Sequence, residues 1–203
     1  MFLIRKKKKV ADKNDELLRV LDDNGNWLGF LEKRGVVHEE KKYYGNVAIW
    51  IIDRTTGDIL IEKRSREKAH NPSKWALIGG HIVNHDTPED TVFSEVKEEI
   101  GVKLNKKRIK KLCILKPVKS NKYGFSHHFY IIIPSKIIKF RLQKEEVEKV
   151  KYINYNKFKN KIKSANEKYS GNWIRYKDAF TKLDKILFDA GILREKYEYE
   201  EDD

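Results

Sequence analysis

The sequence predicts an α/β protein from two kinds of local pattern. Short apolar runs bounded by turn residues are typical of strands, and in two places a pair of such runs is separated as in a β-hairpin. Elsewhere apolar residues recur at spacings of three and four, as on one face of a helix. With 203 residues, no internal repeat and no Pro/Ser-rich linker, one domain with extensions is the simplest prediction.

The two hairpins are expected in the first third of the chain. Asn24-Gly25, a favoured two-residue hairpin turn, lies within residues 16–29. A second Gly-containing turn joins the apolar runs 46–53 and 59–64. A later strand is expected over residues 127–133, before a proline.

A helix is expected to follow Thr87 and to end at Gly101. Thr87 suits the N-cap, Pro88 suits the first helical position, and Asp90 completes a capping-box-like arrangement. Gly101 tolerates the left-handed conformation that often closes a helix. The stripe expected to face the core consists of Phe93, Val96 and Ile100.

Three glutamates lie on the opposite, exposed side of this predicted helix. Glu95, Glu98 and Glu99 have i, i+3, i+4 spacing, so their carboxylates fall within about 100° of one another. A hard cation such as Mg²⁺ or Mn²⁺ would remove their mutual repulsion. Such a cation takes oxygen ligands and is typically shared between carboxylates and substrate phosphates. The alternative is a solvated Glu-rich face. An apolar run, residues 76–80, ends in two glycines before the helix, so strand, glycine loop and acidic helix could form a cradle for a metal-bound phosphate chain.

The spacing of these residues resembles the Nudix box, G-x5-E-x7-R-E-U-x-E-E-x-G-U with U aliphatic. Gly80 begins the match and residues 95–102 complete it. Asp86 stands where the family has Glu, and Ser94 where it has Arg. In the family those two residues are thought to brace the loop against the helix. Here a shorter acid faces a hydroxyl, so the resemblance implies a weaker brace with the three glutamates intact.

The resemblance extends over about residues 16–160. The N-terminal hairpin and the Gly-Gly-His entry at 79–81 are most similar to the isopentenyl-diphosphate-isomerase-like branch of the superfamily. Those isomerases carry a catalytic cysteine at the position of Gly79. The chain's single cysteine, Cys113, lies in an apolar run and is expected to be a buried strand residue. Isomerisation is therefore the less favoured alternative and hydrolysis the better interpretation.

The fold that the resemblance implies is the Nudix α/β/α sandwich, with a mixed sheet, an N-terminal β-hairpin and a C-terminal helical extension. We expect a basic N-terminal segment at 1–15, the Nudix domain at 16–165, and a helix with an acidic tail at 166–203, packed on the same domain. The stripe predicted for that helix consists of Trp173, Tyr176, Phe180, Leu183 and Leu187.

The reaction implied is hydrolysis, dependent on Mg²⁺ or Mn²⁺, of a phosphoanhydride bond in a nucleoside diphosphate linked to another moiety. Glu98 and Glu99 would be the main metal ligands, and Glu95 a ligand or the base that activates water. Gly80 could offer its carbonyl to the metal and, with Gly79, allow close approach of the diphosphate.

Two further residues are candidates from their positions. Glu146 precedes a predicted strand in an acidic loop that in many Nudix domains lies near the metal, so it could be a ligand or general base; a surface carboxylate is the commoner fate. Arg64, at the end of a strand, is either a phosphate clamp or a surface cation.

The net charge of +13 admits two interpretations. A phosphate-rich partner is one. The favoured interpretation is that lysines are spread over the whole surface. They are not interleaved with stacking aromatics, and no zinc-finger or RNP pattern accompanies them. Specific nucleic-acid binding is not supported, and the expected partner is a small diphosphate substrate. Rival functions are a catalytically weak nucleotide-binding module and an RNA-binding module.

The compartment expected is the cytoplasm. One cysteine excludes a disulfide framework, and no apolar run approaches the ~20 residues needed to cross a bilayer. The first four residues, Met1 to Ile4, are followed by basic residues, the reverse of a secretory signal. A homodimer is allowed for.

Overall fold

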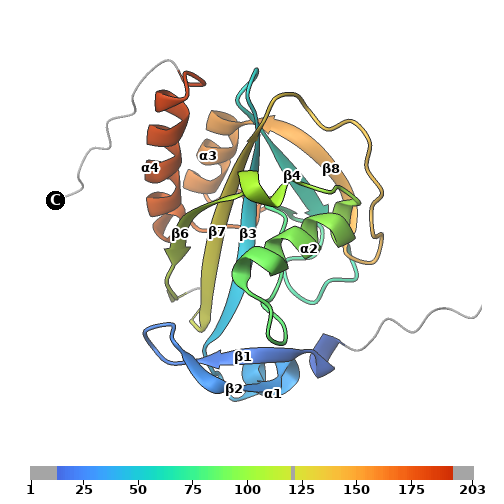
Figure 1. Cartoon of the computed structure of the whole chain (residues 1–203), viewed down its shortest axis with the longest axis vertical. Coiled ribbons are helices and arrows are strands. Elements are labelled where there is room, and N and C mark those ends of the chain that lie inside the picture. The colour runs from blue at the N-terminus through green and yellow to red at the C-terminus, as the bar shows by residue number, and fades with distance from the viewer. Residues whose placement is uncertain (1–12, 120–121, 194–203) are drawn as a thin grey trace, which may run out of the picture.

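The computed structural model describes residues 13–119 and 122–193 (Figure 1). Most of the basic segment expected at 1–15 and the acidic tail expected at 198–203 lie outside the described residues. The three-part division of the chain stays a prediction.

A mixed six-stranded sheet forms the centre of the fold (Figure 1). Its order is β5-β4-β3-β7-β6, and β8 pairs with β4. β3 and β7 are parallel over ten residue pairs, and the other pairings are antiparallel. The sheet is therefore mixed, as expected. The strands are β3 (Tyr44–Asp53), β4 (Asp58–Arg64), β5 (Trp75–Ala76), β6 (Lys110–Leu115), β7 (Gly124–Ile133) and β8 (Val147–Asn154).

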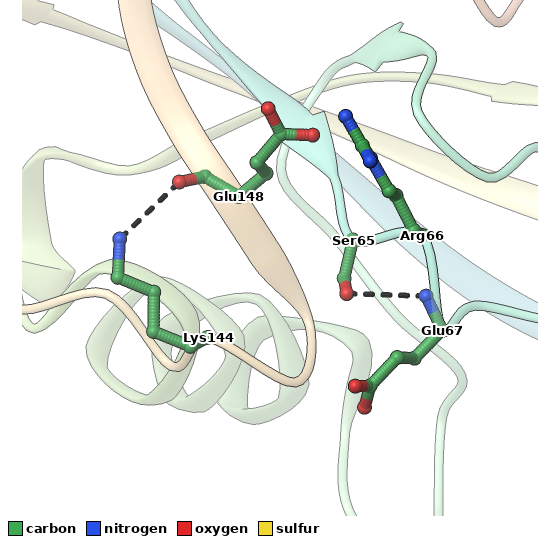
Figure 2. A pocket seen from close by; sticks show the side chains of 5 residues that line it. All are labelled: Ser65, Arg66, Glu67, Lys144 and Glu148. Carbon is green, nitrogen blue, oxygen red and sulfur yellow. Dashed lines mark hydrogen bonds between the residues drawn. The ribbon is translucent and has the colours of Figure 1, made fainter.

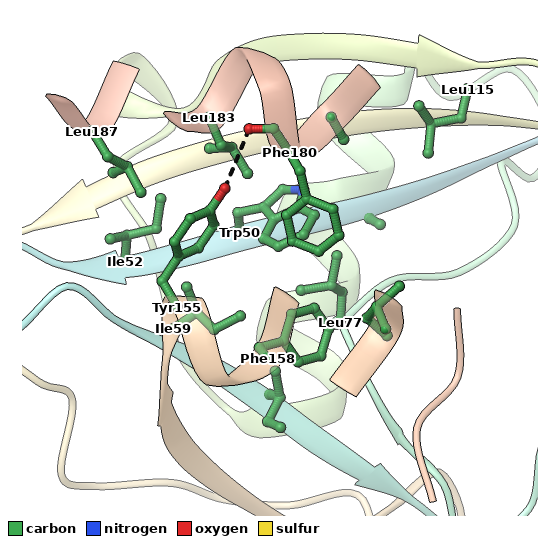
Figure 3. Packing of buried hydrophobic residues seen from close by; sticks show 14 residues of the cluster. Trp50, Ile52, Ile59, Leu77, Leu115, Tyr155, Phe158, Phe180, Leu183 and Leu187 are labelled. Atoms are coloured by element: carbon green, nitrogen blue, oxygen red, sulfur yellow. Dashed lines mark hydrogen bonds between the residues drawn. The ribbon is translucent and has the colours of Figure 1, made fainter. Parts of the chain in front are cut away.

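Helices cover both faces of the sheet: α2 (Pro88–Ile100) on one, α3 (Tyr155–Lys163) and α4 (Trp173–Asp189) on the other (Figure 1). Successive side chains of a strand point to opposite faces of the sheet, so β3 packs against the helices on both sides. Ile49 and Ile51 pack with α2, whereas Trp50 packs with α3 and α4 (Figure 3). The expected α/β/α sandwich is confirmed.

The first hairpin forms a separate two-stranded sheet at the end of the sandwich (Figure 1). β1 (Leu17–Leu21) pairs with β2 (Trp27–Lys33), and a short helix, α1 (Arg34–Glu39), follows. The hairpin was predicted, and α1 was not. Two single-turn 3₁₀ segments, Lys13–Asp15 and Lys106–Arg108, complete the elements.

The α2 helix begins and ends where the sequence predicted. The Thr87 hydroxyl accepts the Asp90 amide, and Gly101 closes the helix with φ 72°. Two details of its faces were wrong. Val92 rather than Phe93 belongs to the fully buried stripe, and Glu99 is buried at 2% exposure instead of lying on an exposed face. The reason for both is that α2 is rotated so that Glu99 also faces the sheet.

The C-terminal helix α4 packs on the sandwich through the predicted stripe, with Phe180, Leu183 and Leu187 fully buried (Figure 3). It also makes a buried polar contact with α3, because the Tyr155 hydroxyl donates to Asp184 Oδ1 at 2.7 Å. Among the described ranges, no helix combines the length and apolarity required to cross a bilayer.

Candidate active site

The glycine loop is held against β3 and α2 at distances that only glycine permits. A Cβ at Gly79 would overlap the Val47 carbonyl, and one at Gly80 would overlap the Glu95 carboxylate. The Gly80 carbonyl accepts the Val47 amide at 2.8 Å, which engages one of its two lone pairs. Gly80 therefore lies against the Glu95 carboxylate, and both the close approach of a diphosphate and the metal contact of Gly80 stay predictions.

The structure places near Glu95 and Glu99 a buried carboxylate that the sequence analysis did not select. Glu62 on β4 has the same parity as Leu60, whose side chain packs in the cluster with α2, so Glu62 also points to that side. It is 0% exposed, and neither carboxylate oxygen accepts a hydrogen bond from a Lys, Arg or backbone donor among the described residues. Burial raises the pKa of Glu62 to about 7, and nearby Arg64 opposes the rise.

Glu99 on α2 faces Glu62. Burial raises its pKa well above the usual value, and the Glu62 carboxylate raises it further. Burial and the mutual repulsion of the two carboxylates both disfavour the doubly ionised pair, so a state in which at least one of the two groups is protonated is favoured.

One ammonium group lies between the carboxylates of two different elements. Lys68 Nζ contacts Glu146, just before β8, and lies 3.8 Å from Glu99 Oε1. Glu146 is itself buried at 4% exposure, and its carbonyl accepts the Ser65 amide at 2.8 Å. The structure thus brings Glu146 next to Glu99, around a cation supplied by the chain itself.

Lys68 and Glu99 border a cavity of about 620 Å³, which Glu62 and Glu146 do not line. Glu95, Glu99 and Arg64 line it, together with both loop glycines, whereas Glu98 is exposed and does not line it. Arg64 Nε donates to the His70 carbonyl at 3.1 Å. Five Lys or Arg side chains and three Glu side chains line the cavity, namely Arg34, Arg64, Lys68, Lys74, Arg175, Glu16, Glu95 and Glu99.

A second, shallow surface pocket contains none of the predicted site residues (Figure 2). Ser65, Arg66, Glu67, Lys144 and Glu148 line it. Its polar groups are engaged locally: Lys144 Nζ donates to the Glu148 carbonyl at 3.3 Å, and Ser65 Oγ accepts the Glu67 amide at 3.2 Å. We assign no chemistry to it.

The residues at the cavity fit a divalent cation by donor chemistry. Glu99 Oε2 is buried without a hydrogen-bond partner, and the cation already present among the acids is the Lys68 ammonium. As the side chains stand, no three His, Cys, Asp or Glu groups within residues 13–119 and 122–193 are placed to hold an ion together. Lys68 and the outward Glu98 are the two side chains that would have to move.

Two residues of this site were missed in the sequence, for different reasons. Glu62 carried a usable signal, because it directly follows the apolar run Ile59 to Ile61 and has the same parity as the inward Leu60. Lys68 carried none, since it lies in an irregular loop between β4 and β5 and reaches the acids only through the fold.

The fold and the acidic helix beside a glycine loop define a Nudix-type domain. The NUDIX domain family model matches residues 42–175, and the chain belongs to this family. Nudix hydrolase 3 of Arabidopsis thaliana is 32% identical over 164 residues, which are 76% of this chain and 21% of that protein. The chain thus spans about a fifth of the length of this curated relative.

Solved structures show the same fold. DR0079 of Deinococcus radiodurans superposes with a TM-score of 0.63 at 16% identity, over 80% of this chain and 97% of that one. The NUDIX domain of NrtR from Shewanella oneidensis, solved in complex with ADP ribose, gives a TM-score of 0.54 at 14% identity, over 70% and 87% of the two chains.

Proposed function

We propose that this protein is a pyrophosphohydrolase, dependent on Mg²⁺ or Mn²⁺, that cleaves a phosphoanhydride bond in a nucleoside diphosphate linked to another moiety. The observation that carries the proposal is one cavity that places Glu95 and Glu99 beside the glycine loop and cationic side chains on its other walls. The ADP ribose in the NrtR domain supports this substrate class. The 32% identity to a Nudix hydrolase supports the activity.

The bound metal would polarise the phosphoanhydride and lower the pKa of the attacking water. Glu98 and Glu99 would be its main ligands, with Glu95 as a ligand or as the group that accepts the water's proton. Glu146 is the second candidate for either role, because it meets Glu99 around Lys68.

Cationic side chains at the cavity would stabilise the charge that develops on the phosphates. Arg64 lines the cavity and has its guanidinium fixed by the His70 carbonyl, so it can face a phosphate in a constant orientation. If a metal ion neutralised the carboxylates, the Lys68 ammonium could turn from them toward the phosphates of the substrate. The glycine loop has no room for a Cβ at Gly79 or Gly80, and it would bring the diphosphate close to Glu95.

The test is a pyrophosphatase screen over nucleotide sugars, dinucleoside polyphosphates, coenzyme A and nucleoside triphosphates with Mg²⁺ or Mn²⁺. We expect metal-dependent turnover of at least one nucleoside diphosphate derivative and none with EDTA. Absence of any turnover, together with tight metal-independent nucleotide binding, would instead identify a binding module. RNA affinity that falls steeply with salt, without cleavage, would identify an RNA platform.

The N-terminal hairpin and the entry at 79–81 support placement in the isopentenyl-diphosphate-isomerase-like branch, which we propose without isomerase activity. The position of the isomerases' cysteine is Gly79, where a side chain would overlap the Val47 carbonyl. Pure protein should therefore not interconvert isopentenyl and dimethylallyl diphosphate. Metal-dependent interconversion would sink the hydrolase assignment.

Compartment and assembly are part of the same proposal. We propose a cytoplasmic protein without a specific nucleic-acid partner and allow for a homodimer. Fractionation of cells that produce the tagged chain, and sedimentation of the pure protein, measure the two properties.

A further inference from the structure

The end of the cavity away from Glu95 and Glu99 contains two arginines that come from different parts of the chain. Arg34 is the first residue of α1, and Arg175 lies in the first turn of α4. Arg34 precedes the range that the family model matches, and Arg175 is the last residue of that range. Both line the same cavity as Glu95 and Glu99.

The two arginines converge on Tyr44 at the start of β3. Arg175 Nη2 donates at 2.6 Å to the carbonyl of Gly124, which is the parallel-sheet partner of Tyr44. Burial raises the pKa of the Tyr44 hydroxyl, and the guanidinium groups of Arg175 and Arg34 both oppose that rise. The phenol therefore lies within the field of both cations.

Arg175 is paired with no carboxylate in the part of the chain that the structure describes. Its Nε is buried without a hydrogen-bond partner, and no ion pair to it occurs within the described ranges. Burial lowers the pKa of its guanidinium, and the opposing groups are Tyr176 and Tyr44 rather than carboxylates. Arg34, in contrast, pairs with Glu16 at 2.9 Å. A half-buried cation with an unused donor at a cavity wall is poorly satisfied by the protein alone.

This end of the cavity is separated along β3 from the part that contains Glu95. Tyr44 precedes Val47, which bonds to Gly80 beside Glu95, by three strand residues, or roughly 10 Å at 3.3 Å per residue. An anion bound at the arginines would have to belong to another part of the substrate.

We propose that Arg175 and Arg34, with the Tyr44 hydroxyl, form a subsite for a second oxyanion, a phosphomonoester or carboxylate on the non-reacting half of the substrate. The proposal rests on the proposed function for its substrate, a nucleoside diphosphate derivative. It narrows that class to compounds that carry an additional anionic group roughly 10 Å from the scissile bond.

Two matched ligand pairs test the subsite and distinguish the two sources of the oxyanion. Coenzyme A and dephospho-coenzyme A differ by one phosphomonoester, and UDP-glucuronate and UDP-glucose differ by one carboxylate. Affinities are measured by calorimetry in EDTA, where metal-dependent hydrolysis does not occur. We expect the charged member of at least one pair to bind about 10- to 100-fold more tightly, as for a hydrogen bond between charged groups.

Variants then assign the preference to the arginines. Arg175→Met should reduce the ratio within the preferred pair to about 1, and Arg34→Met should reduce it in part. Lys185→Met removes an exposed lysine from the same helix, away from the cavity, and should leave the ratio unchanged. Circular dichroism verifies folding, and Arg175→Gln, which also removes the positive charge, replaces Arg175→Met if that variant does not fold.

Equal affinities within both pairs, no measurable binding of any of the four ligands, or a ratio that both arginine variants preserve would each overturn the subsite. Failure of the hydrolase proposal has a different signature. In that case the ratio and its loss in Arg175→Met persist, while Mg²⁺ or Mn²⁺ brings about no turnover.

Discussion

Replacing Glu62 by glutamine should stabilise the metal-free protein, by an amount that grows with pH. The pKa of Glu62 rises from 4.5 to about 7 on folding, which corresponds to a cost of roughly 3 kcal/mol once the group is ionised in both states. Below pH 4.5 both states are protonated and the cost vanishes. Because the folded pKa is the higher one, stability falls as the pH rises from about 4.5 to about 7 and then levels off.

The assay is urea denaturation in EDTA at pH 5 and pH 8. Glu62→Gln removes the titrating group and keeps its volume, so its gain in unfolding free energy should be roughly 2–3 kcal/mol larger at pH 8 than at pH 5. Glu98→Gln, at an exposed position of α2, is the matched control, with a change within about 0.5 kcal/mol at both pH values. A gain for Glu62→Gln that is the same at pH 5 and pH 8 would refute the reasoning.

Three further results are expected. Glu98→Gln and Glu99→Gln should each remove most hydrolysis while the melting temperature stays constant or rises, because each removes one charge and so relieves like-charge repulsion on α2; parental activity in both would identify a merely solvated face. Lys68→Met should tighten Mn²⁺ binding, measured by electron paramagnetic resonance, since the ammonium no longer occupies the space between carboxylates; an unchanged affinity would show that Lys68 does not compete. Asp86→Glu with Ser94→Arg should restore the family's brace and stabilise by about 1–3 kcal/mol, with Ser94→Arg alone gaining less; strict additivity in the double-mutant cycle would show that the two positions do not meet.

Local signals in the sequence predicted the elements that position the site. The cap at Thr87 and the glycine at 101 bounded α2 correctly, and the turn glycines located both hairpins. The strand expected over 76–80 was only partly correct: β5 ends at Ala76, and beyond it only single bridges such as that of Ile78 join the loop to β3.

The elements that were missed differ in how much signal they carry. α1 has none, because Lys33 provides no side-chain cap and the helix is six residues long. α3 had one, since Tyr155, Phe158 and Ile162 recur at spacings of three and four and all are buried.

The position of α2 relative to the sheet determines which of the three glutamates is buried, and the sequence alone did not predict this. Periodicity places Glu99 beside Glu95 and Glu98 on one side of a helix, but it does not say how far that side turns toward the sheet. The contact with Glu62 and Lys68, which buries Glu99 and leaves Glu98 exposed, is made between segments about 30 residues apart.

The parallel pairing of β3 with β7 also determines when the site can form during folding. Tyr44 pairs with Gly124, so 80 residues must be synthesised and closed into a loop before the first contact of this pair is made. The glycine loop and α2 both belong to the segment between these two paired residues. Since long-range parallel contacts form slowly, we expect α2 to pack stably on the sheet only after β7 has paired with β3. A ribosome-bound chain that stops short of Ile133 would then present the glutamates without the cavity that brings them together.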